Sequence, residues 1–332
     1  MAIHKLEQLL EKMSAGDTRA LARLMTLVER AEDEDVVGRI LEAVGSKQGR
    51  AFTIGVTGPP GAGKSSLADG LTSLMRKAGK RVGIVAIDPS SPFTGGALLG
   101  DRIRMSKHYL DTGVFIRSMA TRGSHGGLAR ATKDVIKLFD AAGYDYIMVE
   151  TVGVGQTELD VMGTTDTVLV TLVPEAGDGV QVMKAGLMEI ADIFVVNKAD
   201  RDGSQRMMTE LSLMLELKYS SKPAGETTNS QWRIPVLATQ AINGTGLPEL
   251  FQSIQEHHQS SREFGELERR RTARRREELI SRVEYEVRKR LIAKAQTDPE
   301  LSRFFDEVGA GKLDPHSASH KILESSAFRD GV

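Results

Sequence analysis

The feature that most constrains how this 332-residue chain can fold is a glycine-rich run that directly follows an apolar segment. Residues 58–65 read Gly-Pro-Pro-Gly-Ala-Gly-Lys-Ser and match the pattern G-x-x-x-x-G-K-[S/T]. The β-rich residues 53–57 precede the run, and an amphipathic helical pattern begins near Ser65. An ordinary glycine turn is the alternative interpretation, but the strand–loop–helix setting favours a phosphate-binding loop.

The residue types in this run indicate what each of them would bind. Small residues allow consecutive backbone N–H groups to surround a phosphate at the N-terminus of a helix. Lys64 would reach the β- and γ-phosphates of a nucleotide, and the Ser65 hydroxyl would ligate Mg²⁺. The residues expected to bind the phosphates are Gly58, Pro59, Pro60, Gly61, Ala62, Gly63, Lys64, Ser65 and Ser66.

Short β-rich runs alternate with amphipathic helical stretches between residues 51 and 250. The predicted strands are residues 52–57, 81–87, 114–117, 146–150, 167–173, 193–197 and 235–238. Each run is apolar enough to be buried on both faces, which is typical of a parallel sheet covered by helices. The sequence therefore predicts an α/β fold of the P-loop NTPase class, with a mostly parallel sheet flanked by helices.

Both ends of the chain have helical patterns. Residues 3–45 repeat apolar side chains at i, i+3 and i+4, and we expect Asp17 to cap the second helix. The pattern is helical again from residue 247, until Asp298-Pro299 marks a break before a short tail. We therefore predict an N-terminal helical cap (1–48), a P-loop domain (49–258) and a C-terminal helical arm with its tail (259–332).

The C-terminal arm carries a narrow apolar stripe at helical spacing. The stripe consists of Leu279, Ile280, Val283, Val287 and Leu291. It is too narrow for a helix buried in a core, and narrow stripes are typical of seams between helices. We therefore expect a homodimer built with this arm. The arginine-rich residues 269–276 are interpreted as a solvated helix face, with a partner-docking face as the alternative.

A second motif, Asn197-Lys-Ala-Asp200, ends a predicted strand. A carboxylate at Asp200 can accept hydrogen bonds from N1–H and the exocyclic amine of guanine, whereas adenine has no donors there and would leave a charged group unpaired. The stem of Lys198 can lie along the base, and Asn197 can tie this loop to the phosphate loop. N-K-x-D alone is also a common strand-end turn, but together with the phosphate loop it predicts a guanine nucleotide, GTP or GDP.

Acidic residues end two other predicted strands, at Asp88 and Glu150. Ligands of such sheets bind outside the carboxyl ends of the strands, so both side chains are expected to point toward the phosphates. Gly153 follows closely and could offer its N–H to a γ-phosphate. Asp101, in the long loop after Asp88, is a candidate for orienting magnesium-bound water. Solvated loop acids are the alternative interpretation.

Composition excludes several classes of function. The chain has 44 basic and 45 acidic residues, a net charge of −1, which argues against electrostatic binding to nucleic acid or membrane. It has no cysteine, which excludes disulfides and thiolate chemistry. Its apolar runs are too short to span a bilayer and its N-terminus does not resemble a signal peptide. We therefore expect a cytoplasmic protein.

Several unusual runs together resemble those of the MeaB/ArgK family. They are residues 88–92 (Asp-Pro-Ser-Ser-Pro), 99–102 (Leu-Gly-Asp-Arg), 150–156 (Glu-Thr-Val-Gly-Val-Gly-Gln), 178–186 (Asp-Gly-Val-Gln-Val-Met-Lys-Ala-Gly) and 197–200. The resemblance covers roughly residues 3–290, including the helical cap. Members of this family are GTPases that act as chaperones of adenosylcobalamin-dependent methylmalonyl-CoA mutase.

The resemblance implies a magnesium shell and a catalytic centre. Ser65, Asp88, Asp101 and Glu150 would gather Mg²⁺ and its waters near the γ-phosphate, with Lys64 supplying positive charge. The implied activity is GTP hydrolysis that gates cofactor loading into the mutase and protects or reactivates it.

The resemblance also implies a segment that senses the nucleotide beside the partner, with Asp178, Gln181 and Lys184. From residue type alone, Lys184 is equally well a solvated helix residue. The base loop departs from the family pattern, since Gln240 replaces the usual serine. We expect the Ala241 N–H to meet O6 of guanine nonetheless.

Three alternatives remain open at this point. A nickel-inserting GTPase needs cysteine and histidine relays, and the chain has no cysteine and scattered histidines. A kinase of a transport protein needs a second substrate pocket and a base that activates the acceptor, neither of which the sequence identifies. A scaffold with a purely structural nucleotide is the third alternative. Phosphate release from GTP, measured with and without partners, separates them.

Overall fold

The structure of the protein is a computed structural model that describes residues 3–45, 49–88, 105–120, 127–151, 162–174, 186–220, 232–325 and 328. The chain divides into two compact units, Met1–Glu268 and Arg269–Val332. None of the helices within the described ranges combines the length and the apolar character that a membrane crossing requires.

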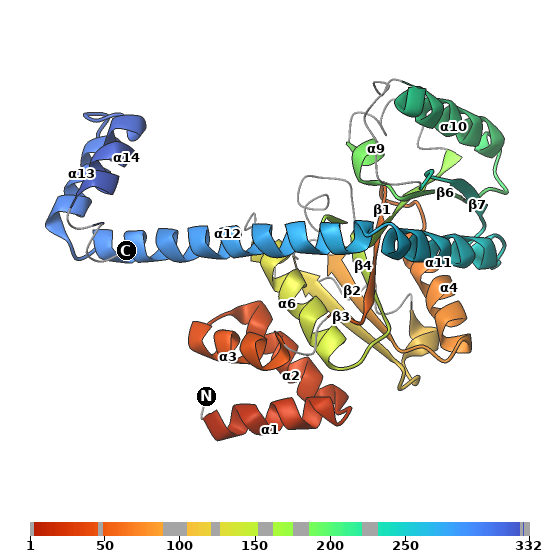
Figure 1. Cartoon of the computed structure of the whole chain (residues 1–332), viewed down its shortest axis with the longest axis horizontal. Helices are drawn as coiled ribbons and strands as arrows, with labels where there is room; N and C mark the ends of the chain where they lie inside the picture. Colours follow the sequence, from red (N-terminus) through yellow and green to blue (C-terminus); the bar gives the residue numbers. More distant parts are fainter. Residues whose placement is uncertain are drawn as a thin grey trace. The chain divides into compact units, whose positions relative to one another are not determined.

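The first unit contains a sheet of seven strands in the order β3-β2-β4-β1-β5-β6-β7, and all neighbouring strands are parallel (Figure 1). The strands are β1 (Phe52–Thr57), β2 (Val82–Asp88), β3 (Val114–Ala120), β4 (Tyr146–Thr151), β5 (Thr167–Leu172), β6 (Ile193–Asn197) and β7 (Val236–Thr239). The predicted parallel α/β fold is confirmed. Strand β3 runs three residues beyond its predicted end because it pairs with β2 as far as Ala120 opposite Asp88.

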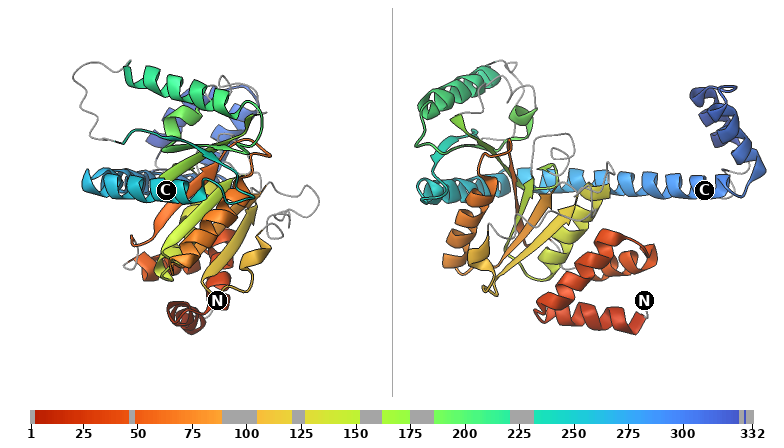
Figure 2. Two further views of the ribbon diagram at one scale, coloured as in Figure 1. Left: turned by 90° about the vertical axis from the view of Figure 1, so that its right-hand side faces the viewer. Right: turned by 180° about the vertical axis from the view of Figure 1, so that it is seen from behind.

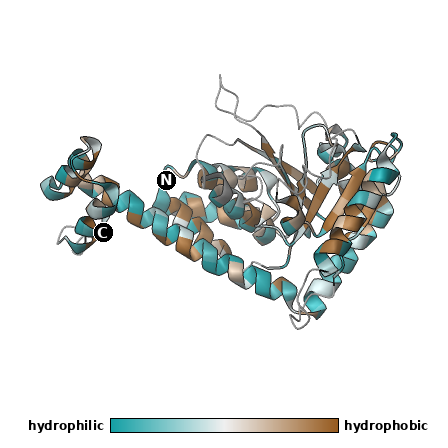
Figure 3. Cartoon of the chain, turned by 90° about the horizontal axis from the view of Figure 1, so that it is seen from above, coloured by the Kyte–Doolittle hydropathy of each residue, from teal (hydrophilic) through white to brown (hydrophobic). Residues whose placement is uncertain are grey.

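Helices cover both faces of this sheet. They are α4 (Lys64–Lys77), α6 (Gly127–Ala141), α9 (Leu187–Ile190), α10 (Ser204–Ser220) and α11 (Leu247–Glu263), with the short 3₁₀ helix η1 (Ser106–His108) before β3. Successive residues of a strand face opposite sides. Leu169 of β5 therefore packs with α4 and α11, whereas Val168 and Val170 pack with α6 and α10. Figure 3 shows the strands as hydrophobic, as burial on both faces requires.

Three helices form the N-terminal cap, α1 (Ile3–Ser14), α2 (Thr18–Arg30) and α3 (Glu34–Gly45). Asp17 caps α2, because its carboxylate accepts hydrogen bonds from the backbone N–H groups of Arg19 at 2.8 Å and Ala20 at 3.1 Å. These bonds lower the pKa of Asp17. The predicted N-terminal helices and the predicted role of Asp17 as the N-cap of α2 are both confirmed. Helices α2 and α3 pack against α6 on one face of the sheet (Figure 2).

The second unit is helical. Helix α12 (Glu266–Ala295) belongs to it from Arg269 onward, and α13 (Pro299–Gly309) and α14 (Pro315–Glu324) follow. Asp298 caps α13 and Asp314 caps α14, each with proline as the first helical residue. The predicted break at Asp298-Pro299 falls between α12 and α13, and the stretch after it, expected as a short tail, holds two capped helices. The predicted domain boundary at 258/259 stays a prediction.

Candidate functional site

The loop between β1 and α4 owes its shape to two glycines. Gly58 has φ 145°, and a Cβ atom there would overlap the carbonyl oxygen of Thr171 on β5. Gly63 has φ 86°, and a Cβ atom there would overlap the side-chain amide of Asn197 at the end of β6. Any other residue at these two positions would be strained and would push the loop away from its neighbours.

Lys64 is the first residue of α4, and its side chain is buried. Its Nζ donates hydrogen bonds to the carbonyl oxygens of Gly58 at 2.8 Å and Pro59 at 3.0 Å. The loop carbonyls therefore hold the ammonium group against the loop itself. A positive charge in this place suits an anionic ligand at the N-terminus of α4, where the backbone N–H groups and the helix dipole also favour negative charge.

Ser65 and Glu150 join α4 to the end of β4. The Ser65 hydroxyl donates a hydrogen bond of 2.6 Å to Oε1 of Glu150, and both side chains are buried. A hydroxyl and a carboxylate in contact supply two of the oxygen ligands that Mg²⁺ prefers. The donor set therefore fits the expected metal. Within the described residues, no group of three or more His, Cys, Asp or Glu side chains gathers as a metal site.

Asn197 connects the phosphate loop to the loop after β7. Its Nδ2 donates to the carbonyl oxygen of Ala62 at 2.8 Å. Its Oδ1 accepts from Thr239 Oγ1 and from the Ala241 backbone N–H, both at 3.1 Å. Because Asn197 is buried and bonded on both sides, it holds the two loops together.

Lys198 and Asp200 follow in a turn beyond the end of β6. Lys198 has φ 53°, a left-handed conformation that is uncommon for residues other than glycine. The Ala199 N–H donates to the Thr239 carbonyl at 3.0 Å, and the Arg201 N–H donates to the Lys198 carbonyl at 3.0 Å. Asp200 is exposed at this turn, so its carboxylate is accessible to a base.

The loop after β7 is closed by its own backbone. Gln240 and Thr245 form an isolated antiparallel bridge, and the N–H groups of Asn243 and Gly244 both donate to the Gln240 carbonyl at 3.0 Å. These bonds define the loop although Gln240 replaces serine. The Ala241 N–H, expected to meet O6 of guanine, donates to Asn197 in this structure. To bind O6 of guanine, the Ala241 N–H would have to leave Asn197 Oδ1 or donate to both oxygens.

The described residues therefore include part of the predicted site. The structure brings together the phosphate loop, Glu150 and the base-binding loops at the carboxyl edge of the sheet. Asp88 is the last residue of β2, but its side chain lies outside the described set. The predicted residues Asp101, Gly153, Asp178, Gln181 and Lys184 also lie outside the described residues.

Two threonines that were not predicted from the sequence support these loops. Thr239 donates to Asn197, and the Thr171 backbone sets how closely Gly58 approaches β5. Thr239 could have been recognised because it ends β7, the strand beside β6, and is paired there with Asn197. Nothing local in the sequence marks Thr171, since its effect depends on how two strands pack.

A phosphate-binding loop and an Asn-Lys-x-Asp loop, joined by Asn197 at one edge of a parallel sheet, define a P-loop GTPase. The profile of the family described as "Methylmalonyl Co-A mutase-associated GTPase MeaB" matches residues 21–296. The chain belongs to this MeaB family, and it is a GTPase that binds guanine nucleotides.

Individual proteins show the same relationship. A protein of Pyrococcus abyssi whose name describes it as a GTPase is 48% identical over 319 residues, which are 96% of each chain. The mitochondrial methylmalonic aciduria type A homolog of Caenorhabditis elegans is 32% identical, over 96% of this chain and 82% of that protein. The crystal structure of a LAO/AO transport system kinase has a TM-score of 0.70 and 26% identity, and covers 98% of both chains.

Proposed function

We propose that this GTPase is a chaperone of an adenosylcobalamin-dependent methylmalonyl-CoA mutase, which gates cofactor loading and protects or reactivates the mutase. The observation that carries the proposal is the match of residues 21–296 to a family described by its association with this mutase. The name of the nematode relative, which refers to methylmalonic aciduria, points in the same direction.

The proposal assigns GTP as substrate and Mg²⁺ as its metal. Ser65, Asp88, Asp101 and Glu150 would hold the ion, and the contact between Ser65 and Glu150 supports the assignment of those two. When bound, Mg²⁺ neutralises charge on the phosphates. Lys64 stabilises negative charge at the same end of α4, so hydrolysis depends mainly on positioning and electrostatics.

Three segments connect the nucleotide to the mutase in this proposal. Residues 88–101 and 150–156 would respond to the γ-phosphate directly, with Gly153 offering its N–H. Residues 178–184 would face the partner through Asp178, Gln181 and Lys184. Binding of GTP and of the mutase must then be coupled, and the coupling must be reciprocal.

The test is a titration of GTP affinity and GTP turnover against purified methylmalonyl-CoA mutase. Typical coupling energies of about 1–3 kcal/mol correspond to roughly 5- to 150-fold changes in affinity. We expect the mutase to raise turnover, and we expect Lys184→Ala to reduce this stimulation more than the intrinsic rate. Lys77→Ala, at an exposed position on α4, is the matched control and should leave both unchanged.

The proposal fails if saturating mutase changes neither GTP affinity nor turnover. A transfer of the γ-phosphate to a protein would instead favour a transport-protein kinase, the activity that the name of the structurally similar LAO/AO protein describes. Following labelled γ-phosphate into inorganic phosphate or into protein separates the two functions. The nickel-chaperone alternative requires nickel binding, which equilibrium dialysis measures.

We also propose that the protein is a homodimer in the cytoplasm, where it would meet its mutase partner. The exposed apolar side chains of Leu279, Ile280 and Val283 on α12 support the dimer, because such a row is stabilised by a second helix.

A further inference from the structure

Two histidines of the second unit lie one turn apart on α14. His316 and His320 are separated by four residues, and both side chains are exposed. Residues at i and i+4 are neighbours on one face of a helix. The two imidazole rings are close, with centroids 4.8 Å apart and planes at 81°. The two metal-binding histidines of the H-E-x-x-H motif have the same spacing, so this pair is a candidate for binding a transition metal.

The distance between the rings suits a shared ion. A ring nitrogen binds Zn²⁺ at about 2.0–2.1 Å, which puts the ion about 3.2 Å from the centre of the ring. Two imidazoles on one ion would therefore have centres about 4.5 Å apart at a right angle and about 5.2 Å apart at the tetrahedral angle. The observed separation of 4.8 Å falls between these two values. The helix thus already brings the two rings to the separation that one ion requires.

The helix that carries the histidines is held in place within the second unit. Asp314 caps α14 by accepting a hydrogen bond of 2.9 Å from the Ser317 N–H. Ala318 is buried, and α14 packs against α13 (Figure 1). Ala318 lies two residues from each histidine, so the histidines are on the opposite face of the helix. Two ligands on a packed helix are preorganised, which reduces the entropy lost when an ion binds.

The donor atoms select the class of metal. Imidazole nitrogen suits Zn²⁺, Ni²⁺ and Cu²⁺, whereas Mg²⁺ prefers oxygen ligands. The pair would therefore not compete with the nucleotide site for Mg²⁺. Within the part of the chain that the structure describes, no third His, Asp or Glu side chain gathers with the two histidines. An ion held by this pair would keep its other positions for water or for a ligand from another molecule.

We propose that His316 and His320 together bind one divalent transition-metal ion per chain, in the second unit and independently of the nucleotide. The proposal goes beyond the GTPase activity and beyond the mutase. It also bears on the nickel-chaperone alternative, because Ni²⁺ held by this pair would not identify a nickel chaperone. Only nickel binding that persists without the pair would support that alternative.

The experiment measures Ni²⁺ binding to the full-length protein, without any added histidine tag, by titration calorimetry in excess Mg²⁺. His316→Ala and His320→Ala should each weaken binding about 100-fold, because a second ligand on the same scaffold binds intramolecularly. Cu²⁺ should bind more tightly than Ni²⁺, and Mn²⁺ more weakly, in the usual order for such ligands. GTP affinity should be the same in both variants as in the unmodified protein, which also shows that they are folded.

Two controls separate the pair from histidine content alone. His4→Ala removes an exposed histidine of α1 that has Gln8, and not a histidine, one turn later. It should leave the Ni²⁺ affinity within about twofold, because a single ligand gains nothing from a second one. His320→Ala combined with Lys321→His keeps the number of histidines but moves the second ring by about 100° around the helix. This variant should bind Ni²⁺ as weakly as His320→Ala.

Three results would overturn the inference. The first is Ni²⁺ affinity that stays within about twofold of the unmodified protein in both single variants, which would favour a nickel site elsewhere. The second is a shifted pair that binds as tightly as the original pair, and the third is an unmodified protein that binds no Ni²⁺. None of these results affects the proposed chaperone function, because no substituted residue belongs to the nucleotide site.

Discussion

The two compact units of this chain use apolar side chains in opposite ways. In the first unit, strands such as β1 and β5 are buried along their whole length between two layers of helices. In the second unit, Leu279, Ile280 and Val283 of α12 are 64%, 52% and 53% exposed. The only buried residue of α12 is Leu267, which belongs to the first unit. The strands of the first unit are therefore buried within that unit, whereas α12 leaves apolar side chains exposed, which the proposed dimer would cover.

The two units also differ in where their polar side chains lie. In the first unit, buried polar groups such as Lys64, Ser65, Glu150 and Asn197 gather around the phosphate loop. Burying such groups is costly unless they are bonded, so their concentration at one edge of the sheet marks a site built for a ligand. The described part of the second unit carries charged side chains mainly on exposed helix surfaces. We therefore assign nucleotide chemistry to the first unit, and the second unit carries the proposed self-association.

The largest effect is expected from Lys64→Ala. Removal of this buried ammonium group should lower GTP turnover by at least about 100-fold, because no other described side chain donates from the same place in the loop. The protein should still fold, since Lys64 is not part of the apolar core on either face of the sheet. Lys77→Ala, on the exposed end of the same helix, should behave like the unmodified protein. Unchanged GTP affinity and turnover in Lys64→Ala would remove the phosphate-loop assignment.

Asp200→Asn should change which base the first unit binds. Loss of a charged acceptor costs about 1.5–3 kcal/mol, which corresponds to roughly 10- to 150-fold weaker GTP binding. Xanthine carries a carbonyl where guanine carries an amine, so the new amide should favour xanthosine triphosphate. Competition binding of the two nucleotides measures the ratio, and Asp202→Asn in the same exposed turn is the control. A ratio equal to that of the unmodified protein would exclude Asp200 from base recognition.

Val283→Asp tests the self-association proposed for the second unit. A charge in an apolar seam should weaken the proposed dimer by about tenfold or more, because the carboxylate would be buried without a partner. Ser281→Asp adds the same charge at an exposed residue outside the stripe and should leave the dimer intact. Sedimentation gives the association constants, and GTP affinity should be equal in both variants. Equal dimerisation in the two variants would contradict the seam.

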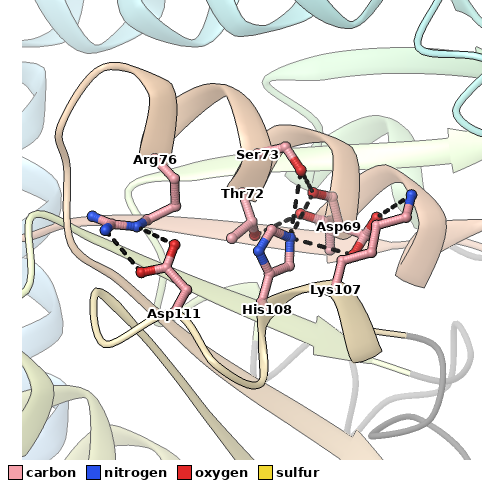
Figure 4. A network of polar contacts seen from close by, with 8 residues as sticks. Asp69, Thr72, Ser73, Arg76, Lys107, His108 and Asp111 are labelled. Carbon is pink, nitrogen blue, oxygen red and sulfur yellow. Dashed lines mark hydrogen bonds and ion pairs between the residues drawn. The ribbon is translucent and has the colours of Figure 1, made fainter.

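The smallest effect concerns the acid stability of the first unit. Arg76 donates two hydrogen bonds of 2.8 Å to the carboxylate of Asp111 (Figure 4). These bonds lower the pKa of Asp111 from 3.8, so the stabilisation from this pair is present above pH 3.8 and is lost as pH falls through the lowered value. Asp111→Asn should cost about 1 kcal/mol at pH 7, since both side chains are partly exposed. The difference in unfolding free energy should disappear at strongly acidic pH. A difference that stays constant down to pH 2 would show that the ionised carboxylate is not what stabilises the contact.

The sheet could be predicted from the sequence because its signals are local. Seven apolar runs bounded by polar turns predicted all seven strands, and the side chain of Asp17 predicted the start of α2. The glycine-rich loop and the Asn-Lys-x-Asp loop could also be predicted, because each consists of consecutive residues.

Contacts between distant residues could be predicted only where a motif implied them, as for Asn197 and the phosphate loop. The hydrogen bond from Ala241 to Asn197 and the contact between Asp69 and His108 depend on how strands and helices pack, which no short run of sequence specifies. The helices after Asp298 were missed although Asp298-Pro299 and Asp314-Pro315 are recognisable helix starts, and although Leu301, Phe304, Phe305 and Val308 follow at helical spacing.

A direct test of the contrast between the two units compares the full-length protein with residues 1–268. Sedimentation and equilibrium binding of GTP would be measured on both proteins under the same conditions. If the first unit holds the whole nucleotide site and the second holds the dimer contact, residues 1–268 should be monomeric and should bind GTP within about threefold of the full-length protein. A dimer that persists without residues 269–332, or a loss of GTP affinity beyond about tenfold, would contradict this division of roles.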